Sequence, residues 1–273
     1  MTGRLVICPT PIGNLEDVTL RVLSALREAD VLACEDTRRT RVLLDRYGVK
    51  AKLVSYHEHN EKGRASELVR RMRDGAVVAL VSDAGMPLIS DPGFLLVRGC
   101  VAAGLPVEVL PGPSAAITAL VASGLPADEW HFHGFLPRKR GELRRVVTEA
   151  GGTLVAFESP RRVAATLSLV AELDPERAVA VCRELTKAHE EVLRGTAAEL
   201  AVRYGDVPPK GEVVLVLGPP SGGEAGQDDA PAGLDALRRL VDAGAHPRKA
   251  AAVVAELTGG SANLLYRALT ARD

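Results

Sequence analysis

The sequence predicts an α/β protein made of two α/β domains, followed by a small helical C-terminal domain. Short apolar runs alternate with amphipathic segments through the first 125 residues, and the alternation continues less regularly to residue 218. Such alternation is typical of layered α/β domains. A polar stretch over residues 219–232 then precedes a last group of helical patterns. Because domains commonly contain about 100–200 residues, a chain of 273 residues favours two main domains over one.

The first predicted domain covers residues 1–125. Short apolar runs predict strands that are buried on both faces of a mostly parallel sheet, and they fall at Leu5–Cys8, Val31–Cys34, Leu53–Tyr56, Val77–Val81 and Val107–Leu110. The amphipathic segments predict helices over Leu20–Ala29, Thr37–Tyr47, Ala65–Asp74, Phe94–Ala103 and Ser114–Ser123. Gly48, Gly75 and Gly104 stand where helices should stop.

The second predicted domain covers residues 126–218, and we expect some antiparallel pairing in its sheet. Its expected strands are Trp130–Phe135, Thr153–Phe157, Val179–Arg183, Glu191–Arg194 and Val213–Leu217, and its expected helices are Glu142–Ala150, Val163–Leu173 and Ala197–Tyr204. Residues 219–232 are a linker by composition. Residues 233–273 predict three short helices, over Leu234–Ala243, Pro247–Leu257 and Ala262–Thr270.

The composition excludes several classes of protein. No apolar run approaches the ~20 residues that a membrane span needs, and the N-terminus lacks the pattern of a signal peptide. The four cysteines are far apart and form no C-x-x-C pair, which favours reduced, buried thiols in a reducing compartment. We therefore expect a cytoplasmic protein with no membrane segment and no metal. The net charge of −1 means that any nucleic-acid contact must come from local patches.

Three loops of the first domain follow strands at the edge where open α/β sheets bind ligands. The first, Pro9–Asn14, has two prolines and Gly13, and a rigid turn alone would explain it. It lacks the G-x-G-x-x-G pattern, which argues against a dinucleotide site. The second, Ser82–Gly93, holds two aspartates, two glycines and two prolines, more than a turn requires. The third, Leu110–Ala116, ends a strand at a Pro-Gly-Pro segment, where Ser114 can cap the next helix, and capping alone would explain that serine.

The second domain contributes a fourth region, made of residues 157–162 and 183–187. Glu158 can be explained as a polar strand end. Glu184 and Lys187 can be explained as an exposed helical pair at i, i+3, worth only a few tenths of a kcal/mol. Neither explanation is excluded by the sequence.

Taken together and in order, these segments resemble one family. The motifs PTPIGN, CEDTRRT, HEHNE, SDAGMPLISDPG, LPGPSAAITAL, FESPRR, RELTK and KGE are similar to those of the ribosomal RNA small-subunit methyltransferase I family, within the tetrapyrrole methylase superfamily. The resemblance covers Leu5 to about Gly218. It implies two α/β domains with a cofactor cleft between them, S-adenosylmethionine as methyl donor, and a homodimer. It also implies 2′-O-methylation of a cytidine in the decoding region of 16S ribosomal RNA, with the small ribosomal subunit as partner.

The resemblance also implies which residues form the cofactor site. Carried over position by position, this site should contain Pro11, Ser82, Asp83, Ala84, Leu88, Ser114, Ala115, Phe157 and Leu185. A ribose hydroxyl is a poor nucleophile at neutral pH, so some group should take its proton. The candidates are Glu158 or Glu184 as the base and Lys187 as the cation beside the forming alkoxide, with His57 and His59 as alternatives. The two histidines are too closely spaced and too isolated to indicate a metal site.

Three basic runs are candidates for contacts to RNA phosphates. They contain Arg38 and Arg39; Arg138, Lys139 and Arg140; and Arg161 and Arg162. Aromatic residues make up only 3% of the chain, so recognition of an assembled subunit by shape and charge is favoured over stacking on a free strand. Two other functions stay open at this point: a small-molecule methylase that acts on a tetrapyrrole, and a non-catalytic RNA-binding assembly factor.

Overall fold

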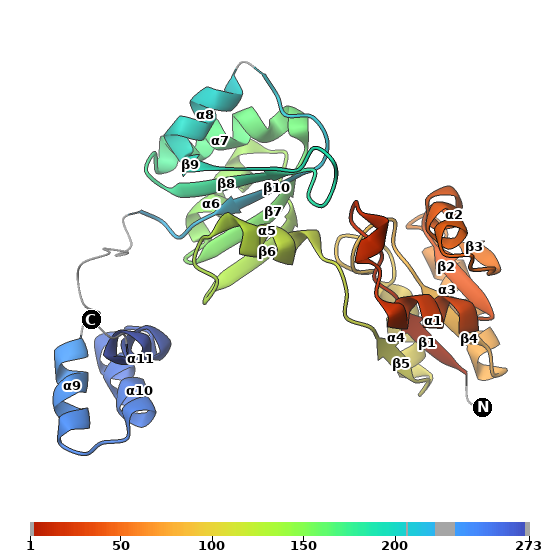
Figure 1. The fold of residues 1–273 in the computed structure, drawn as a ribbon, viewed down its shortest axis with the longest axis horizontal. Coiled ribbons are helices and arrows are strands. Elements are labelled where there is room, and N and C mark those ends of the chain that lie inside the picture. Colours follow the sequence, from red (N-terminus) through yellow and green to blue (C-terminus); the bar gives the residue numbers. More distant parts are fainter. Residues whose placement is uncertain (1–2, 206, 222–232, 271–273) are drawn as a thin grey trace. The chain divides into compact units, whose positions relative to one another are not determined.

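The computed structural model describes residues 3–205, 207–221 and 233–270. The chain divides into two compact units, residues 1–223 and 224–273. Within the described residues, the first unit contains two five-stranded sheets with their helices, and the second contains three helices (Figure 1). The predicted fold class, two α/β domains and a helical C-terminal region, is confirmed.

The first sheet is parallel throughout. It consists of β1 (Arg4–Ile7), β2 (Val31–Cys34), β3 (Leu53–Ser55), β4 (Val77–Leu80) and β5 (Val107–Val109), in the order β3-β2-β4-β1-β5. β1 lies inside the sheet, where Leu5 pairs with Val78 of β4 and with Val107 of β5. The carboxyl ends of all five strands therefore meet at one edge, which brings the loops after β1, β2, β4 and β5 together.

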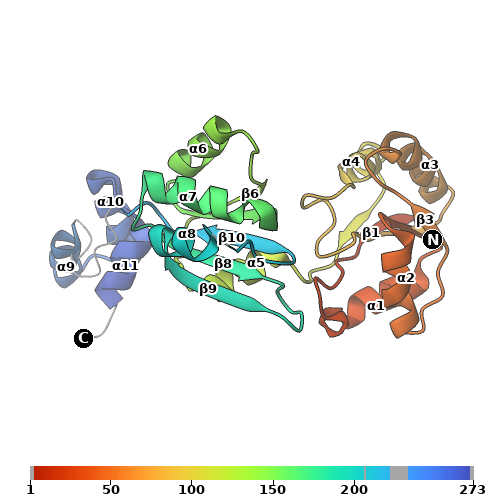
Figure 2. The ribbon, with the colours of Figure 1, turned by 90° about the horizontal axis from the view of Figure 1, so that it is seen from above.

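Helices cover both faces of this sheet, which is why its inner strands β2 and β4 are continuously apolar. Leu5 and Ile7 pack with α3 (Glu61–Arg73) and α4 (Phe94–Ala102) on one face. Val6 and Cys8 pack with α1 (Leu20–Glu28) and α2 (Thr37–Arg46) on the other. Figure 2 shows these two pairs of helices on opposite sides of the sheet. All four cysteines of the chain are buried, and burial raises the pKa of the Cys8 thiol to about 12.

Helix α3 begins at Glu61, four residues before the predicted start. The reason is the turn that precedes it. The Asn60 side chain accepts a hydrogen bond from the backbone N–H of His57 and donates one to the carbonyl of Ser55. These two bonds close the turn at Asn60, so the helix can begin directly after it. The first turn of α3 is polar and lacks an apolar stripe, and the sequence pattern therefore did not predict it.

The second sheet is mixed. It consists of β6 (Trp130–Phe135), β7 (Thr153–Glu158), β8 (Ala178–Arg183), β9 (Glu191–Thr196) and β10 (Val213–Leu217), in the order β6-β7-β10-β8-β9. Only the β6–β7 pair is parallel, and the other three pairs are antiparallel. The expected antiparallel pairing is therefore present.

Four helices pack on this second sheet. α6 (Arg140–Glu149), α7 (Val163–Leu173) and α8 (Ala197–Gly205) cover one face. α5 (Ala115–Ser123) covers the other, where Ala119 and Leu120 lie in one apolar cluster with Val155, Ala180 and Val216. The packing therefore groups α5 with the second sheet, although the sequence boundary at residue 125 groups it with the first.

The C-terminal unit contains α9 (Leu234–Asp242), α10 (Pro247–Thr258) and α11 (Ala262–Thr270), which share an apolar core around Leu237, Ala251 and Leu265. Pro247 stands in the first turn of α10, and Gly259 ends that helix in the left-handed conformation. Of the predicted linker, residues 222–232 lie outside the described residues. Among the residues that are described, no helix is long and apolar enough to cross a membrane.

Candidate functional site

A cleft of about 410 Å³ lies between the loop edge of the first sheet and the second sheet. The first domain lines it with the loops after β1, β2 and β4, represented by Ile12, Glu35 and Asp83. The second lines it with the end of β7 and with residues around Leu185 and Gly211. Its walls combine apolar surface with several carboxylates, as is usual for sites that bind small molecules with polar groups.

Most of the residues predicted for the cofactor site line this cleft. They are Asp83, Ala84, Ser114, Ala115, Phe157 and Leu185. Pro11, Ser82 and Leu88 are not among the lining residues. Ser82 acts on the loop itself: its hydroxyl donates to the carbonyl of Gly85 at 3.1 Å, while its own carbonyl accepts from the Thr10 hydroxyl at 3.0 Å. The first bond closes the loop after β4 on itself, and the second ties it to the loop after β1.

Helix capping, the simpler explanation for Ser114, does not use its side chain. Ser114 occupies the N-cap position of α5 with extended backbone, but its side chain makes no capping hydrogen bond. Its neighbour Ala115 is the first helical residue, and both line the cleft. The hydroxyl of Ser114 is therefore not used by the helix.

The loop after β4 holds backbone conformations that L-residues rarely adopt. Leu88 and Ser90 have φ angles of 74° and 67°. Gly93 has a φ of 143°, and a Cβ there would lie 2.7 Å from a methyl carbon of Leu88. Such conformations persist where the surroundings enforce them, and they gather at functional sites. In this loop they place Ser90 and Asp91 at the mouth of the cleft.

Three carboxylates of the first domain face the cleft: Glu35, Asp83 and Asp91. Asp83 is fixed by the backbone N–H of Asp36 at 2.9 Å and lies 3.6 Å from the guanidinium of Arg39. Burial, followed by the negative charge of Glu35, raises the pKa of Asp91 to about 6. Burial also raises the pKa of Glu35, with a further contribution from Asp83. Glu35 and Asp91 were not predicted as site residues, although both stand in the motifs that carry the resemblance.

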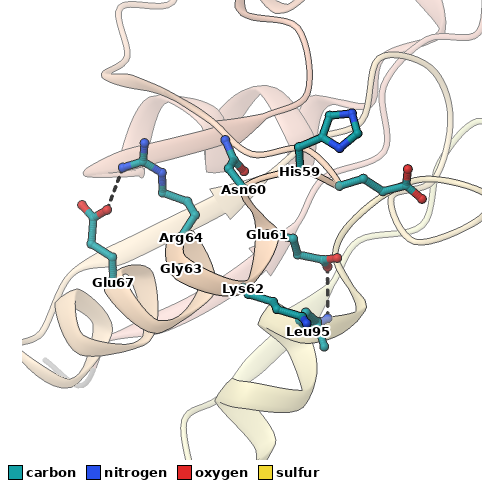
Figure 3. Close-up of a pocket in the computed structure, with 9 residues that line it drawn as sticks. His59, Asn60, Glu61, Lys62, Gly63, Arg64, Glu67 and Leu95 are labelled. Carbon is teal, nitrogen blue, oxygen red and sulfur yellow. Dashed lines mark hydrogen bonds and ion pairs between the residues drawn. The ribbon is translucent and has the colours of Figure 1, made fainter.

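The cleft continues outward along the first domain. Glu35, Ser90 and Asp91 also line a neighbouring hollow that reaches His57 and Phe94. That hollow in turn shares Glu58, His59 and Glu61 with an open pocket at the start of α3. Figure 3 shows this pocket, with Glu61 bonded to the backbone of Leu95 and Arg64 paired with Glu67. We call the two outer hollows together the outer groove.

Glu158 is buried at the end of β7, with 1% of its side chain exposed. Its two carboxylate oxygens accept hydrogen bonds from the backbone N–H of Ser159 and from the Thr166 hydroxyl, both at 2.7 Å. The guanidinium of Arg162 lies 3.3 Å away and also donates to the carbonyls of Leu136 and Pro137. The carboxylate of Glu158 therefore already contacts Ser159, Thr166 and Arg162, all within its own domain.

Glu184 and Lys187 lie in a loop after β8 and not on a helix. Lys187 Nζ donates to Glu184 at 2.7 Å and to Glu212 at 3.0 Å. The hydrogen bond from Lys187 lowers the pKa of Glu184, and the hydrogen bonds to Glu184 and Glu212 raise the pKa of Lys187 against the effect of burial. The loop touches the loop after β1, because the N–H of Asn14 donates to the Thr186 hydroxyl at 3.0 Å. Of these residues, only Glu212 lines the cleft.

The predicted RNA-contacting residues differ in whether they already form ion pairs within the protein. Arg38 is 90% exposed but bonded to Asp36, Lys139 is paired with Glu142, and Arg140 is paired with Glu172. Within the described part of the chain, Arg138 and Arg161 are exposed and form no ion pair. Arg39 lines the cleft, and Arg162 is committed to Glu158.

No group of three or more His, Cys, Asp and Glu side chains in the described residues is arranged to hold a metal ion. His57 and His59 contact each other edge-to-face at 5.9 Å, and both line the outer groove. His57 Nε2 lies 3.2 Å from the Asn60 amide nitrogen. The Asn60 amide nitrogen is identified as the donor because it also bonds to the carbonyl of Ser55, while the amide oxygen accepts from the N–H of His57. His57 Nε2 is therefore the acceptor in this contact, and the ring proton is on Nδ1.

Comparison with known proteins identifies the family. A family profile described as Tetrapyrrole (Corrin/Porphyrin) Methylases matches residues 4–201. The chain belongs to this family. Proteins named Ribosomal RNA small subunit methyltransferase I are also similar to it: 47% identical in Mesorhizobium japonicum, over 97% of this chain and 90% of that one, and 44% identical in Escherichia coli O157:H7, over 97% and 94%. The family expected from the motifs is confirmed, and the chain is a methyltransferase.

A third relative differs in extent. The protein of that name from Thermotoga maritima is 45% identical over 79% of this chain and 98% of its own length, so it is the shorter protein. Among solved structures, uroporphyrin-III-C-methyltransferase from Thermus thermophilus has a TM-score of 0.57 at 24% identity, over 80% of this chain and 94% of that one. A form of that enzyme complexed with S-adenyl homocysteine has a TM-score of 0.56 at 23% identity, over 79% and 97%. Both share the fold of this methylase.

Proposed function

We propose that this chain transfers a methyl group from S-adenosylmethionine to the 2′-hydroxyl of a cytidine in the decoding region of 16S ribosomal RNA. The observation that carries the proposal is the cleft of about 410 Å³ between the two α/β domains. Its volume falls in the range of about 300–1,000 Å³ that is usual for ligand sites. The family membership and the names of the relatives that cover nearly the whole chain support the same activity.

The residues of the cleft fit the methyl donor. Ala84 and Ala115 are small enough to let a flat base lie against the backbone, and Phe157 and Leu185 offer apolar surface. Asp83 can accept hydrogen bonds from ribose hydroxyls or attract the positive charges of the donor. When bound, S-adenosylmethionine supplies a methyl group that its sulfonium has already activated. The protein's part is then to orient the acceptor and to move its proton.

Several features support an RNA acceptor. The outer groove opens from the cleft and offers room for a nucleotide and its neighbours. Among the described residues without an ion pair, Arg138 lies in the loop after β6 and Arg161 in the short 3-10 helix after β7 (Pro160–Arg162). Guanidinium groups bind phosphates well. We further propose that the protein acts on the small ribosomal subunit, as a homodimer in the cytoplasm. The resemblance of the motifs supports these last points.

The test is methyl transfer from labelled S-adenosylmethionine to purified 16S RNA, 30S subunits and 70S ribosomes. We expect one labelled cytidine in the 30S sample, with the phosphodiester bond next to it resistant to alkali, because a 2′-O-methyl group removes the attacking hydroxyl. Label on a base would contradict the ribose assignment. Label on a tetrapyrrole with none on RNA would favour a small-molecule methylase. Failure to bind S-adenosylmethionine in calorimetry, with RNA binding intact, would favour an assembly factor.

A further inference from the structure

Asp91 stands at the point where two hollows meet. It lines the cofactor cleft and also the outer groove, so a nucleotide in the groove reaches the cleft by passing this side chain. The strained backbone at Ser90 and the glycine at Gly93 hold the segment in place. Among the described residues that line both hollows, the only others are Glu35 and Ser90.

The candidates predicted from the sequence are less available for proton transfer. The carboxylate of Glu158 is buried and already accepts two hydrogen bonds. Glu184 and Lys187 neutralise each other at 2.7 Å and do not line the cleft. His57 and His59 line the outer groove but not the cleft, and the Nε2 of His57 is occupied by Asn60.

We propose that Asp91 is the catalytic base of this methylase and that its carboxylate takes the proton of the acceptor hydroxyl. The proposal rests on the function proposed above and assigns a residue to its central step. As the hydroxyl oxygen bonds to the methyl carbon, the carbon–sulfur bond breaks and its electron pair stays on sulfur. The hydroxyl proton moves to a carboxylate oxygen of Asp91. The products are a methyl ether, a neutral thioether and protonated Asp91, which returns its proton to water.

The surroundings of Asp91 suit a base that works near neutral pH. A general base is most effective when its pKa lies near the working pH. Burial and the carboxylates of Glu35 and Asp83 raise the pKa of Asp91 to about 6, against a hydrogen bond from Ser82 that lowers it. Other charged or titratable groups line the two hollows around it: Arg39, His57, Glu58, His59 and Glu61 from the first domain, and Glu158 and Glu212 from the second.

The first experiment measures single-turnover methyl transfer at saturating RNA and donor, from pH 5 to 9. In the wild type we expect the rate to rise about tenfold per pH unit below pH ~6 and then to level off. Asp91→Asn should lower the plateau by about 10²- to 10⁴-fold, which is the usual contribution of a general base, and should abolish that rise. Glu35→Gln should move the midpoint to lower pH, because it removes a neighbouring negative charge. Asp45→Asn, an exposed position on α2, is the matched control and should behave as wild type.

The second experiment needs no activity. Protein labelled with ¹³C at the aspartate carboxyl carbons is titrated by NMR without ligand, and the resonance that is missing in Asp91→Asn is assigned to Asp91. We expect this resonance to titrate near pH 6 in the wild type and at lower pH in Glu35→Gln. Calorimetry with S-adenosylmethionine should give the same affinity for Asp91→Asn as for wild type, within about twofold.

The outcomes separate this proposal from the proposed function. A wild type that methylates no RNA overturns the function, and the base assignment falls with it. An active wild type with an Asp91→Asn variant that keeps the plateau rate and the pH profile overturns the base assignment alone. So does a rate loss that a matching loss of donor affinity explains. If Asp91→Asn does not fold, a midpoint of the pH–rate profile that does not move in Glu35→Gln overturns it equally.

Discussion

The hydroxyl of Thr166 donates a hydrogen bond of 2.7 Å to the carboxylate of Glu158, entirely inside the second domain. Thr166 belongs to α7 and is 1% exposed, while Glu158 ends β7. The bond therefore ties a strand to the helix that follows it. Arg162 extends the link, because it contacts Glu158 and donates to the carbonyls of residues 136 and 137. Glu158, which the motifs suggested as a catalytic base, therefore has a structural role within the second domain.

Glu158→Gln should affect stability more than catalysis. Glutamine keeps the size of the side chain, but it removes the charge that faces Arg162 and replaces one acceptor oxygen with a donor. Hydrogen bonds to charged groups are worth about 1.5–3 kcal/mol, so we expect the free energy of unfolding to fall by about that amount. Urea denaturation measures this fall, and the single-turnover rate of the folded variant should stay within about tenfold of wild type. Glu149→Gln, at an exposed pair with Arg145, is the control and should change neither. A rate loss of a thousandfold with unchanged stability would restore the catalytic role.

Lys187→Met should weaken donor binding more than it slows transfer. The variant removes the cation between Glu184 and Glu212, and Glu212 lines the cleft. The pKa of Glu184 is lowered, so the stability it contributes is present above its ordinary range and is lost as pH falls through its folded value. The pKa of Lys187 is raised above 10.5, so its contribution disappears only in strong alkali. The melting temperature should therefore differ from wild type between pH 6 and 9 and converge toward it near pH 4.

Lys139→Met provides a matched control for this variant. Lys139 also pairs with a glutamate three residues away, but 83% of its side chain is exposed. Exposed pairs contribute little, so neither melting temperature nor donor affinity should change. If both lysine variants behave alike, the loop around Lys187 has no special role. If Lys187→Met slows transfer far more than it weakens binding, the role predicted from the sequence is supported.

The positions of β2 and β10 could be predicted because all their residues are buried and apolar, and both have the predicted bounds. β6 also has the predicted bounds, although its residues alternate between half-buried and exposed over most of its length. The sheet on which α5 packs could not be predicted, because its alanines suit either surface. The spacing of Glu184 and Lys187 fits a helix as well as the loop that is present, where Glu184 has a φ of 50°. That conformation depends on contacts with residues 13, 14 and 212, which are distant in the sequence.

The candidate site was predictable in part, and for similar reasons. Short motifs identified the loops that meet at the cleft, and six of the nine predicted cofactor residues line it. The sequence could not distinguish Asp83 from Asp91, two aspartates of one loop. Asp83 is fixed by the backbone of Asp36, whereas Asp91 lies between two hollows. The difference arises from the strained turn at Leu88 and Ser90, which no local pattern reveals.

Ala115→Trp should abolish donor binding while the protein stays folded. Ala115 lines the cleft at the start of α5, where an indole would fill the space expected for the donor. Calorimetry with S-adenosylmethionine should show at least a hundredfold loss of affinity, with an unchanged circular dichroism spectrum. Ala102→Trp, at an exposed position that ends α4, is the control for adding a tryptophan. Unchanged binding by Ala115→Trp would remove this position from the donor site.

Asp91→Asn should make the protein more stable at neutral pH. The pKa of Asp91 is raised from 3.8 to about 6, so the folded state holds its proton longer than the unfolded state does. The free energy of unfolding of the wild type therefore falls as pH rises from about 4 to 6. Asparagine does not ionise, so Asp91→Asn does not show this fall. Because the group is partly exposed, solvent screening reduces the gain to roughly 1 kcal/mol. Urea unfolding at pH 4.5 and 7.5 measures it: the variant's advantage should appear only at the higher pH. An equal difference at both pH values would contradict the raised pKa.

The C-terminal unit should act on RNA affinity and not on the donor. Residues 233–273 contain six Lys and Arg residues against four Asp and Glu residues, of which Arg272 and Asp273 lie outside the described part. Arg239 is paired with Asp235 and Arg248 lies over the ring of Tyr266, whereas Lys249 is exposed on α10. The alternative is a packing appendage that supports the dimer. The shorter relative from Thermotoga maritima shows that proteins of this name need not have a chain of this length.

A truncation after Ser221 tests the two alternatives, since the hydrogen bonds of Ser221 to Asp174 then remain. Filter binding to 30S subunits across a salt series should give weaker binding and a flatter slope of log affinity against log salt, by about 0.7–0.9 for each phosphate that the protein no longer neutralises. Donor affinity should not change, because every residue that lines the cleft precedes residue 215. A full-length variant with Arg238, Lys249 and Arg267 replaced by Gln should reproduce the flatter slope while it keeps the unit folded. If the truncated protein is folded and dimeric and binds with the wild-type slope and affinity, the unit does not bind phosphates, and the packing role is correct.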